Sequence, residues 1–150
     1  GGVVLVPWFE GERTPNLPTA RASLDGLSLE NTTRENLARA AVEGMLAGLA
    51  TGLEAIRSLG VATERVLLVG GAARNPAVAA VAAQVFDVPV AVPSPGEYVA
   101  QGAARQAAAV LAGSWPEWPV AMDRDAASDP RPEVRERYDR VAARRAAELR

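Results

Sequence analysis

Arg65-Val-Leu-Leu-Val-Gly-Gly-Ala-Ala-Arg-Asn-Pro76 joins an apolar run to a pair of glycines and a helix start. The run Val66–Val69 carries no polar residue, which is typical of a strand buried on both faces of a parallel sheet. Asn75 is a favourable N-cap, and Pro76 suits the first position of a helix. The pattern predicts a buried strand, a glycine turn and a largely buried helix over residues 76–86.

A second strand and a second helix follow almost directly. Val88-Pro-Val-Ala-Val92 is rich in β-branched residues, and Pro89 indicates that it begins a strand or lies at a sheet edge. Ser94 and Glu97 have the spacing of a capping box, which predicts a helix over residues 97–111. Strand, helix, strand and helix form a βαβα unit, so we expect a parallel sheet with a right-handed crossover.

Two extended segments and a long helix precede this unit. We expect Val3–Phe9 and Arg21–Leu29 to be extended. Thr32 and Glu35 again have capping-box spacing, and Gly60 suits the end of the helix that follows. Apolar residues recur at helical spacing on one expected face: Leu37, Val42, Met45, Leu46, Leu49, Leu53 and Ile56.

Glycine recurs every fourth residue on that helix, at Gly44, Gly48 and Gly52. Each glycine costs a helix interior about 1 kcal/mol relative to alanine, so a compensating gain is expected. A stripe without side chains lets another backbone approach closely, and tight packing is the favoured interpretation. A functional hinge is the alternative.

The C-terminal part has a different composition. Asp123–Pro132 is polar and interrupted by proline, which predicts a linker, and Glu133–Arg150 has the pattern of a charged amphipathic helix that packs back on the body. We therefore divide the chain into a lobe over residues 1–113 and a linker with a helix over residues 114–150.

Several chemistries are excluded by absent residue types. The chain has no Cys and no His, and all 16 basic residues are Arg. Disulfides, Cys/His zinc sites, catalytic histidine, Schiff-base lysine and the P-loop lysine are therefore excluded within this sequence. The net charge of −2 gives no electrostatic case for nucleic acid. No stretch has the pattern of a signal peptide or a membrane span, so we expect a soluble, cytoplasmic protein without membrane contact.

The glycine turn is the strongest candidate for a binding site. Glycine lets a ligand lie against the backbone, and a helix start offers free N–H groups with a positive dipole end. The candidate nucleotide contacts are Gly70, Gly71, Ala72 and Asn75. On physical grounds alone a purely structural turn explains the pattern as well, because it matches neither GxGxxG nor GxxxxGK[ST].

Two weaker candidates have structural interpretations that we favour. Arg13 lies in the polar loop Gly11–Pro15 and has the chemistry to pair with a phosphate or carboxylate, but a structural ion pair is the simpler interpretation. Tyr98 and Gln101-Gly102 lie near the start of a helix and would border a pocket there. A small residue at Gly102 is also what a helix buried against a sheet requires.

A two-part pattern closely resembles the second signature of the FGGY carbohydrate kinases. It is Ala22-Ser-Leu24-Asp-Gly26-Leu27 and, after eight residues, Asn36-Leu37-Ala-Arg-Ala40-Ala41-Val42-Glu43. The resemblance covers about residues 1–112. Within the family, the segment Trp8-Phe-Glu-Gly-Glu-Arg-Thr-Pro15 looks most like the xylulokinases (xylulose kinases). Glycerol kinases tend to have Gly after the corresponding Ala-Arg pair, whereas here Ala22 follows Arg21.

The resemblance implies both a fold and a reaction. The fold is an α/β lobe of the actin-like ATPase (ribonuclease H-like) class, with a mixed sheet and flanking helices. The reaction transfers the γ-phosphoryl group of ATP, with Mg²⁺, to a sugar or polyol hydroxyl. The family's glycine turn lies beside the adenine nucleotide, so Gly71 and Asn75 are expected to make direct contacts. Ala72 replaces the third small residue or glycine of many members.

The resemblance also places part of the machinery elsewhere. The family's catalytic Asp, first phosphate loop and most sugar contacts belong to its N-terminal lobe, so no catalytic residue and no metal ligand is assigned within this chain. We expect it to be inactive alone and to work with that lobe, the sugar and ATP; a homodimer is left open. The predicted reaction converts D-xylulose to xylulose 5-phosphate. The alternatives are another FGGY kinase, acting on glycerol, gluconate or ribulose, and a non-catalytic actin-like binding module.

Overall fold

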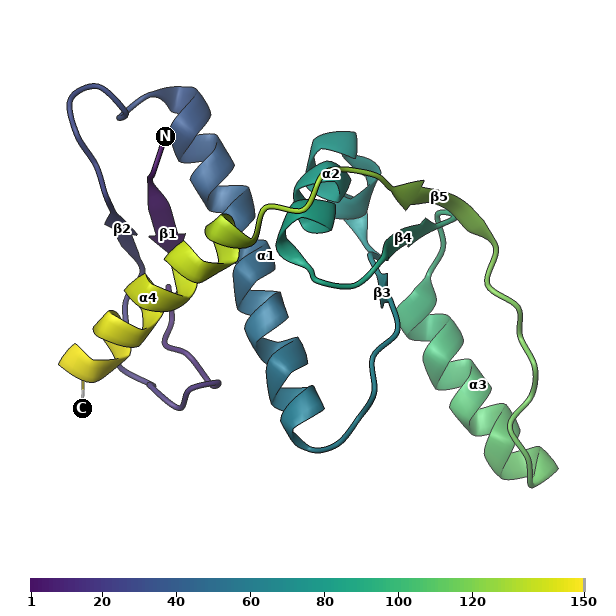
Figure 1. Ribbon diagram of the computed structural model, residues 1–150. Helices are drawn as coiled ribbons and strands as arrows, with labels where there is room; N and C mark the ends of the chain where they lie inside the picture. Colours follow the sequence, from purple (N-terminus) through teal and green to yellow (C-terminus); the bar gives the residue numbers. More distant parts are fainter. Residues whose placement is uncertain (150) are drawn as a thin grey trace.

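The structure, a computed structural model, describes residues 1–149 and contains two small sheets with helices packed around them (Figure 1). In chain order the elements are β1 (Val4–Val6), β2 (Ser23–Asp25), α1 (Arg34–Ser58), β3 (Val66–Leu67), the 3-10 helix η1 (Gly71–Arg74), α2 (Pro76–Val85), β4 (Val90–Pro93), α3 (Tyr98–Ala112), β5 (Met122–Ala126) and α4 (Pro132–Glu148).

The predicted βαβα unit is present. Strands β3 and β4 are parallel, with Val66 opposite Val90, and η1 and α2 connect them. The side chain of Asn75 caps α2 by accepting from the Ala77 N–H at 3.0 Å, and Pro76 takes the first helical position. As predicted, α2 is largely buried, through Val78, Ala79, Val81, Ala82 and Val85.

Strand β3 is shorter and more exposed than its sequence predicts. It pairs with β4 on one side only within the described sheet, so one of its edges has no strand beside it. Leu67 and Val69 are 38% and 47% exposed. The expectation of burial on both faces is therefore wrong for this strand.

Strand β5 lies within the segment that composition assigns to a linker. It pairs antiparallel with β4, so the mixed sheet has the order β3-β4-β5 with β4 at its centre. All four residues of β4 are buried. A buried strand needs partners for its backbone groups on both edges, and β5 supplies the second set.

Helix α1 begins one residue later than the capping-box spacing predicts. The hydroxyl of Thr33, not Thr32, accepts from the Asn36 N–H at 3.2 Å. The Thr32 hydroxyl instead donates to the Ser28 carbonyl at 2.5 Å and stabilises the preceding turn. The capping box at Thr32 and Glu35 is therefore wrong, although the helix itself is present.

The buried face of α1 is built mainly from small residues. Its buried positions are Ala40, Gly44, Leu46, Ala47 and Ala50, whereas Met45, Leu49 and Ile56 from the expected face are 40%, 57% and 47% exposed. At Gly44 a Cβ would collide with the carbonyl oxygen of Leu5 on β1. Close packing, the favoured interpretation of the glycine stripe, therefore holds at Gly44, but no described atom lies within 4 Å of a Cβ built at Gly52.

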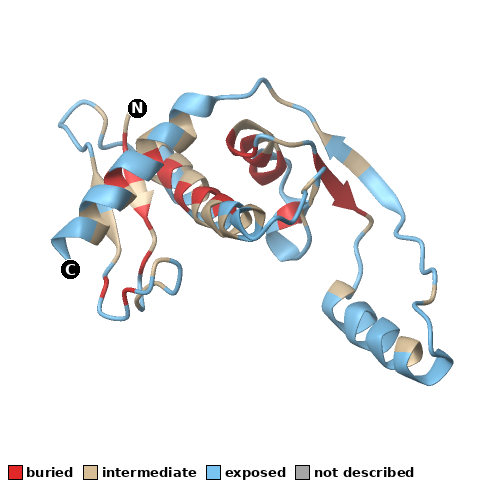
Figure 2. Cartoon of the chain, turned by 60° about the horizontal axis from the view of Figure 1, so that its bottom comes forward, coloured by how far each residue is buried: buried red, intermediate tan, exposed pale blue. Residues whose placement is uncertain are grey.

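The main core lies where β1, α1, α2 and α4 meet (Figure 2). Val6 and Leu46 have no exposed surface, and α4 adds Tyr138 and Val141, which are 4% and 7% exposed. The predicted C-terminal helix thus packs back on the body, although its expected last residue, Arg150, lies outside the described residues. Within residues 1–149, none of the helices combines the length and apolar character needed to cross a membrane.

Helix α3 projects from the rest of the molecule and contributes no buried residue (Figure 2). Its capping box is wrong: within the described chain Glu97 forms no side-chain cap, and the Tyr98 hydroxyl donates to the Ser94 carbonyl. Packing against a sheet does not explain Gly102 either, since no described atom lies within 4 Å of a Cβ built there.

Candidate functional site

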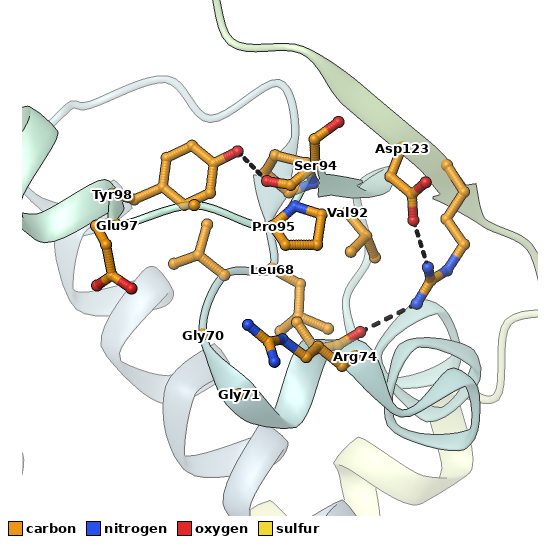
Figure 3. Close-up of a pocket in the computed structure, with 15 residues that line it drawn as sticks. Leu68, Gly70, Gly71, Arg74, Val92, Ser94, Pro95, Glu97, Tyr98 and Asp123 are labelled. Atoms are coloured by element: carbon orange, nitrogen blue, oxygen red, sulfur yellow. Dashed lines mark hydrogen bonds and ion pairs between the residues drawn. The ribbon is translucent and has the colours of Figure 1, made fainter.

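A cavity of about 380 Å³ opens at the carboxyl ends of the parallel strands β3 and β4 (Figure 3). Its walls come from the glycine turn after β3, the loop from β4 into α3, and β5. In open α/β sheets, ligands bind at this end of the strands, because the connecting loops diverge there and leave a crevice.

The glycine turn forms one wall of this cavity. Gly70 has φ 97° and ψ −179°, a backbone conformation that residues with a side chain avoid. Gly71 does not have a positive φ, and a Cβ built on it would have no described atom within 4 Å. Backbone strain therefore explains glycine at position 70, whereas at position 71 the glycine leaves open space beside the cavity.

The predicted site residues divide into two groups. Gly70 and Gly71 line the cavity, together with Ala73 and Arg74 of the same turn. Ala72 and Asn75 belong to the turn but do not line the cavity, and Asn75 Oδ1 is used in capping α2. Contacts of Ala72 and Asn75 with a nucleotide therefore stay predictions.

The weaker candidates are placed differently. Tyr98 lines the cavity, and its hydroxyl is held by the Ser94 carbonyl, so it helps to shape the β4–α3 loop. Gln101 and Gly102, one turn further along α3, do not line it. Arg13 lies in the loop that follows β1 and is not among the lining residues.

Three charged residues of the cavity were not singled out in the sequence. Arg74 lies inside the glycine turn, and its place between two candidate residues was a usable signal. Asp123 and Arg124 come from β5 and reach the cavity only because that strand pairs with β4. The polar sequence around Asp123 and Arg124 predicts a linker, so no local sequence signal places these two residues at the cavity.

The charges of the cavity are partly paired within the protein. Arg124 Nη1 donates to Asp123 Oδ2 at 2.6 Å, and Arg124 Nη2 donates to the Ala73 carbonyl at 3.0 Å. The carboxylate of Asp123 is therefore compensated by its neighbour, while Arg74 contributes a second permanent cation to the wall. Among the described residues no group of three or more acidic side chains is arranged to hold a metal ion.

An ion pair between Arg57 and Asp87 lies away from this cavity. Arg57, at the end of α1, donates to both Asp87 carboxylate oxygens at 2.8 and 3.0 Å. These hydrogen bonds hold the pKa of Asp87 below its usual value. The pair fixes the end of α1 to the connection between α2 and β4, a structural task.

Comparison with known proteins shows which family this chain belongs to. Residues 1–111 match the model of the FGGY family of carbohydrate kinases, C-terminal domain. The chain is 37% identical over 149 residues to a xylulose kinase of Streptomyces rubiginosus, which covers 99% of this chain and 31% of that protein. It is also 39% identical over 116 residues to a glycerol kinase of Rhodopirellula baltica, covering 76% of this chain and 21% of that protein.

A solved structure resembles the whole fold. The crystal structure of xylulose kinase from Bifidobacterium adolescentis superposes with a TM-score of 0.80 at 48% sequence identity, over 94% of this chain and 28% of that one. The chain thus spans less than a third of the length of these relatives. The likeness confirms the predicted α/β lobe with a mixed sheet and flanking helices.

Proposed function

The chain belongs to the FGGY family of carbohydrate kinases, and on that premise we propose that it is the ATP-binding portion of a xylulose kinase. The proposed reaction moves the γ-phosphoryl group of ATP to a hydroxyl oxygen of D-xylulose, which loses its proton, and yields xylulose 5-phosphate and ADP. The observation that carries the proposal is a cavity at the carboxyl ends of β3 and β4, walled by Gly70 and Gly71, in a chain of this family.

The residues of the cavity fit a nucleotide. Gly70 and Gly71 leave the backbone accessible, so a phosphate or ribose can lie against it and accept from its N–H groups. Arg74 adds a guanidinium suited to phosphate oxygens. ATP, when bound with Mg²⁺, supplies the phosphoryl group, and the cation neutralises part of its charge.

The task of this lobe is to bind and orient the donor. Phosphoryl transfer depends mainly on positioning and charge neutralisation, so a rigid donor site is a substantial contribution. The general base for the sugar hydroxyl and most acceptor contacts are assigned to the family's N-terminal lobe. Closing that lobe over the cavity would exclude water from the reaction.

A second activity, the phosphorylation of glycerol, has support of its own. The glycerol kinase of Rhodopirellula baltica is as similar in identity as the xylulose kinase of Streptomyces rubiginosus, although over fewer residues. We favour xylulose because the Streptomyces relative matches 99% of the chain and because the loop Trp8–Pro15 looks like that group.

A fusion tests the donor role. The chain replaces its matching region in the Streptomyces rubiginosus xylulose kinase, and ATP-dependent phosphorylation of D-xylulose is measured. We expect the fusion to be active and the 150-residue chain alone to be inactive. A well-folded fusion without turnover would contradict the donor role, and robust turnover by the isolated chain would contradict the division of labour.

The identity of the phosphoryl acceptor needs a different measurement, since most acceptor contacts are assigned to the N-terminal lobe. The intact enzyme that contains this domain is assayed with D-xylulose, ribulose, gluconate and glycerol at equal concentration. We expect the highest kcat/KM for D-xylulose. A higher value for glycerol would favour the second candidate.

A further inference from the structure

Part of the cavity wall comes from beyond the residues that match the family model. That match ends at residue 111, whereas Asp123 and Arg124 of β5 line the cavity. Both lie in the segment whose composition predicts a linker, so neither the family model nor the sequence pattern assigns them a task. Their placement depends on how β5 pairs with β4.

An irregularity in that pairing brings both side chains to the cavity. Val92 lies opposite Arg124, but Pro93 lies opposite Met122, so Asp123 is an extra residue on β5. In a regular strand adjacent side chains point to opposite faces, whereas a bulge inserts a residue and re-aims its side chain. This irregularity lets Asp123 and Arg124 both line the cavity, where they form an ion pair.

Arg124 connects β5 to the glycine turn. Its Nη2 donates to the carbonyl of Ala73 at 3.0 Å, and its Nη1 donates to Asp123 at 2.6 Å. Both ends of the guanidinium are thus engaged by the protein (Figure 3). Ala73 belongs to η1 and is buried, so its carbonyl is shielded from water and needs a donor.

The glycine turn is a short 3-10 helix bounded by long hydrogen bonds. Ala73 N–H donates to the Gly70 carbonyl at 3.2 Å, and Asn75 N–H donates to the Ala72 carbonyl at 3.1 Å. Both distances lie at the long end of the usual range, and glycine at position 70 adds backbone freedom. A charge-assisted hydrogen bond from Arg124, on a strand of the same sheet, is therefore a strong addition.

We propose that Arg124 is a positioning residue for the donor site: it holds the glycine turn in the conformation that presents Gly70 and Gly71 to the cavity. Asp123 orients the guanidinium and neutralises it. Arg124 therefore acts on the nucleotide through the turn and is not a phosphate ligand. The significance for nucleotide binding rests on the proposed function, whereas the hold on the turn can be measured without any nucleotide.

Amide hydrogen exchange on the full chain, followed by NMR, tests the hold on the turn. Loss of one charge-assisted hydrogen bond predicts about tenfold faster exchange of the Ala73 and Asn75 amides in Arg124→Ala. Arg124→Lys should recover only part of the protection, because an ammonium group lacks the planar fork that spans two acceptors. Arg140→Ala, at an exposed position of α4, is the matched control. Exchange in Arg124→Ala that equals the control would overturn the proposal.

Nucleotide titrations separate a positioning role from direct phosphate binding. The amides of residues 70–75 are followed while ATP, ADP or AMP is added to the wild-type chain and to Arg124→Ala. A positioning residue raises Kd for all three by a similar factor, about five- to tenfold, whereas a phosphate ligand raises Kd for ATP most. An ATP-selective loss would therefore overturn the positioning role.

A wild-type chain whose turn does not respond to any nucleotide would contradict the proposed function, while the exchange rates would still decide whether Arg124 holds the turn.

Discussion

Two helices of this molecule have opposite environments, and the one with fewer charged residues is the exposed one. Helix α1 crosses the main core and buries five residues, among them Leu46 with no exposed surface. Helix α3 contains one charged residue in fifteen and buries none, and its Leu111 is 90% exposed. Apolar composition therefore does not decide burial; the neighbouring elements do, and they hold α1 between β1, α2 and α4.

This contrast divides the molecule into a stabilising part and a binding part. The stabilising part comprises β1, α1, α2 and α4, where the buried side chains gather. The binding part comprises η1, the start of α3 and β5, where the cavity opens and few side chains are buried. Substitutions should consequently affect unfolding free energy in the first part and ligand binding in the second.

Matched leucine truncations give the largest expected difference. Leu46→Ala removes a fully buried side chain and should lower the unfolding free energy by about 2–5 kcal/mol, through lost burial and the cavity that remains. Leu111→Ala, on exposed α3, should change it by less than about 0.5 kcal/mol. Urea unfolding followed by circular dichroism measures both. Equal losses would show that α3 is packed in solution and would remove the contrast.

Glycine-to-alanine substitutions on the same two helices should have effects of opposite sign. At Gly44 the added methyl group meets the Leu5 carbonyl, and the overpacking should cost about 1–3 kcal/mol. At Gly102 the methyl group meets no described atom, so helix propensity should make the protein about 1 kcal/mol more stable. The same urea titrations measure these changes. A stabilising Gly44→Ala would show that β1 does not approach α1 as closely as described.

The sequence predicted several parts of this fold that depend on local rules, although the two capping boxes, which are local as well, were wrong. The N-cap at Asn75 with Pro76, the strand–glycine–helix order and the parallel pairing of β3 with β4 all follow from nearby residues. The glycine turn was also found, because glycine pairs between a strand and a helix are visible locally. These features need no knowledge of distant segments.

Several other features depend on contacts that local rules do not contain. The inner face of α1 is defined by Ala40, Gly44 and Ala47, which hydrophobic periodicity gives little weight, because close backbone approach selected small residues. Strand β5 exists because buried β4 needs a partner on its second edge. Arg124 reaches the cavity for the same reason, so its contact with the glycine turn could not be predicted from its own neighbours.

The loss of stability at alkaline pH tests whether the Tyr138 phenol is buried in the stabilising part. Burial raises the pKa of Tyr138 to about 12, with Glu12 adding to the effect, whereas an unfolded tyrosine titrates near 10. The unfolded chain thus ionises first, so the stability contributed by the neutral phenol is present below about pH 10 and is lost as pH rises toward 12. About 1.4 kcal/mol should be lost by pH 11.

The composition makes this measurement unusually direct. The chain has no Lys and no Cys, whose side chains would otherwise lose protons over the same pH range. Urea titrations at pH 9 and pH 11 should show a smaller fall for Tyr138→Phe than for the wild type. Identical falls would mean that the phenol of Tyr138 is not buried in solution.

Gly71→Arg should separate binding from stability most clearly, because its expected effect on unfolding is the smallest. A Cβ built at Gly71 has no described atom within 4 Å and needs no strained backbone, so the unfolding free energy should change by less than about 0.5 kcal/mol. The same side chain would project beside the cavity that we assign to the nucleotide. In the active fusion we expect KM for ATP to rise about tenfold or more, while KM for D-xylulose stays within about twofold, since the lost interaction is with the donor alone. Gly102→Arg, on exposed α3 and outside the cavity, is the matched control. An unchanged KM for ATP in a folded Gly71→Arg fusion would move the donor site away from the glycine turn, and with it the division between a stabilising and a binding part.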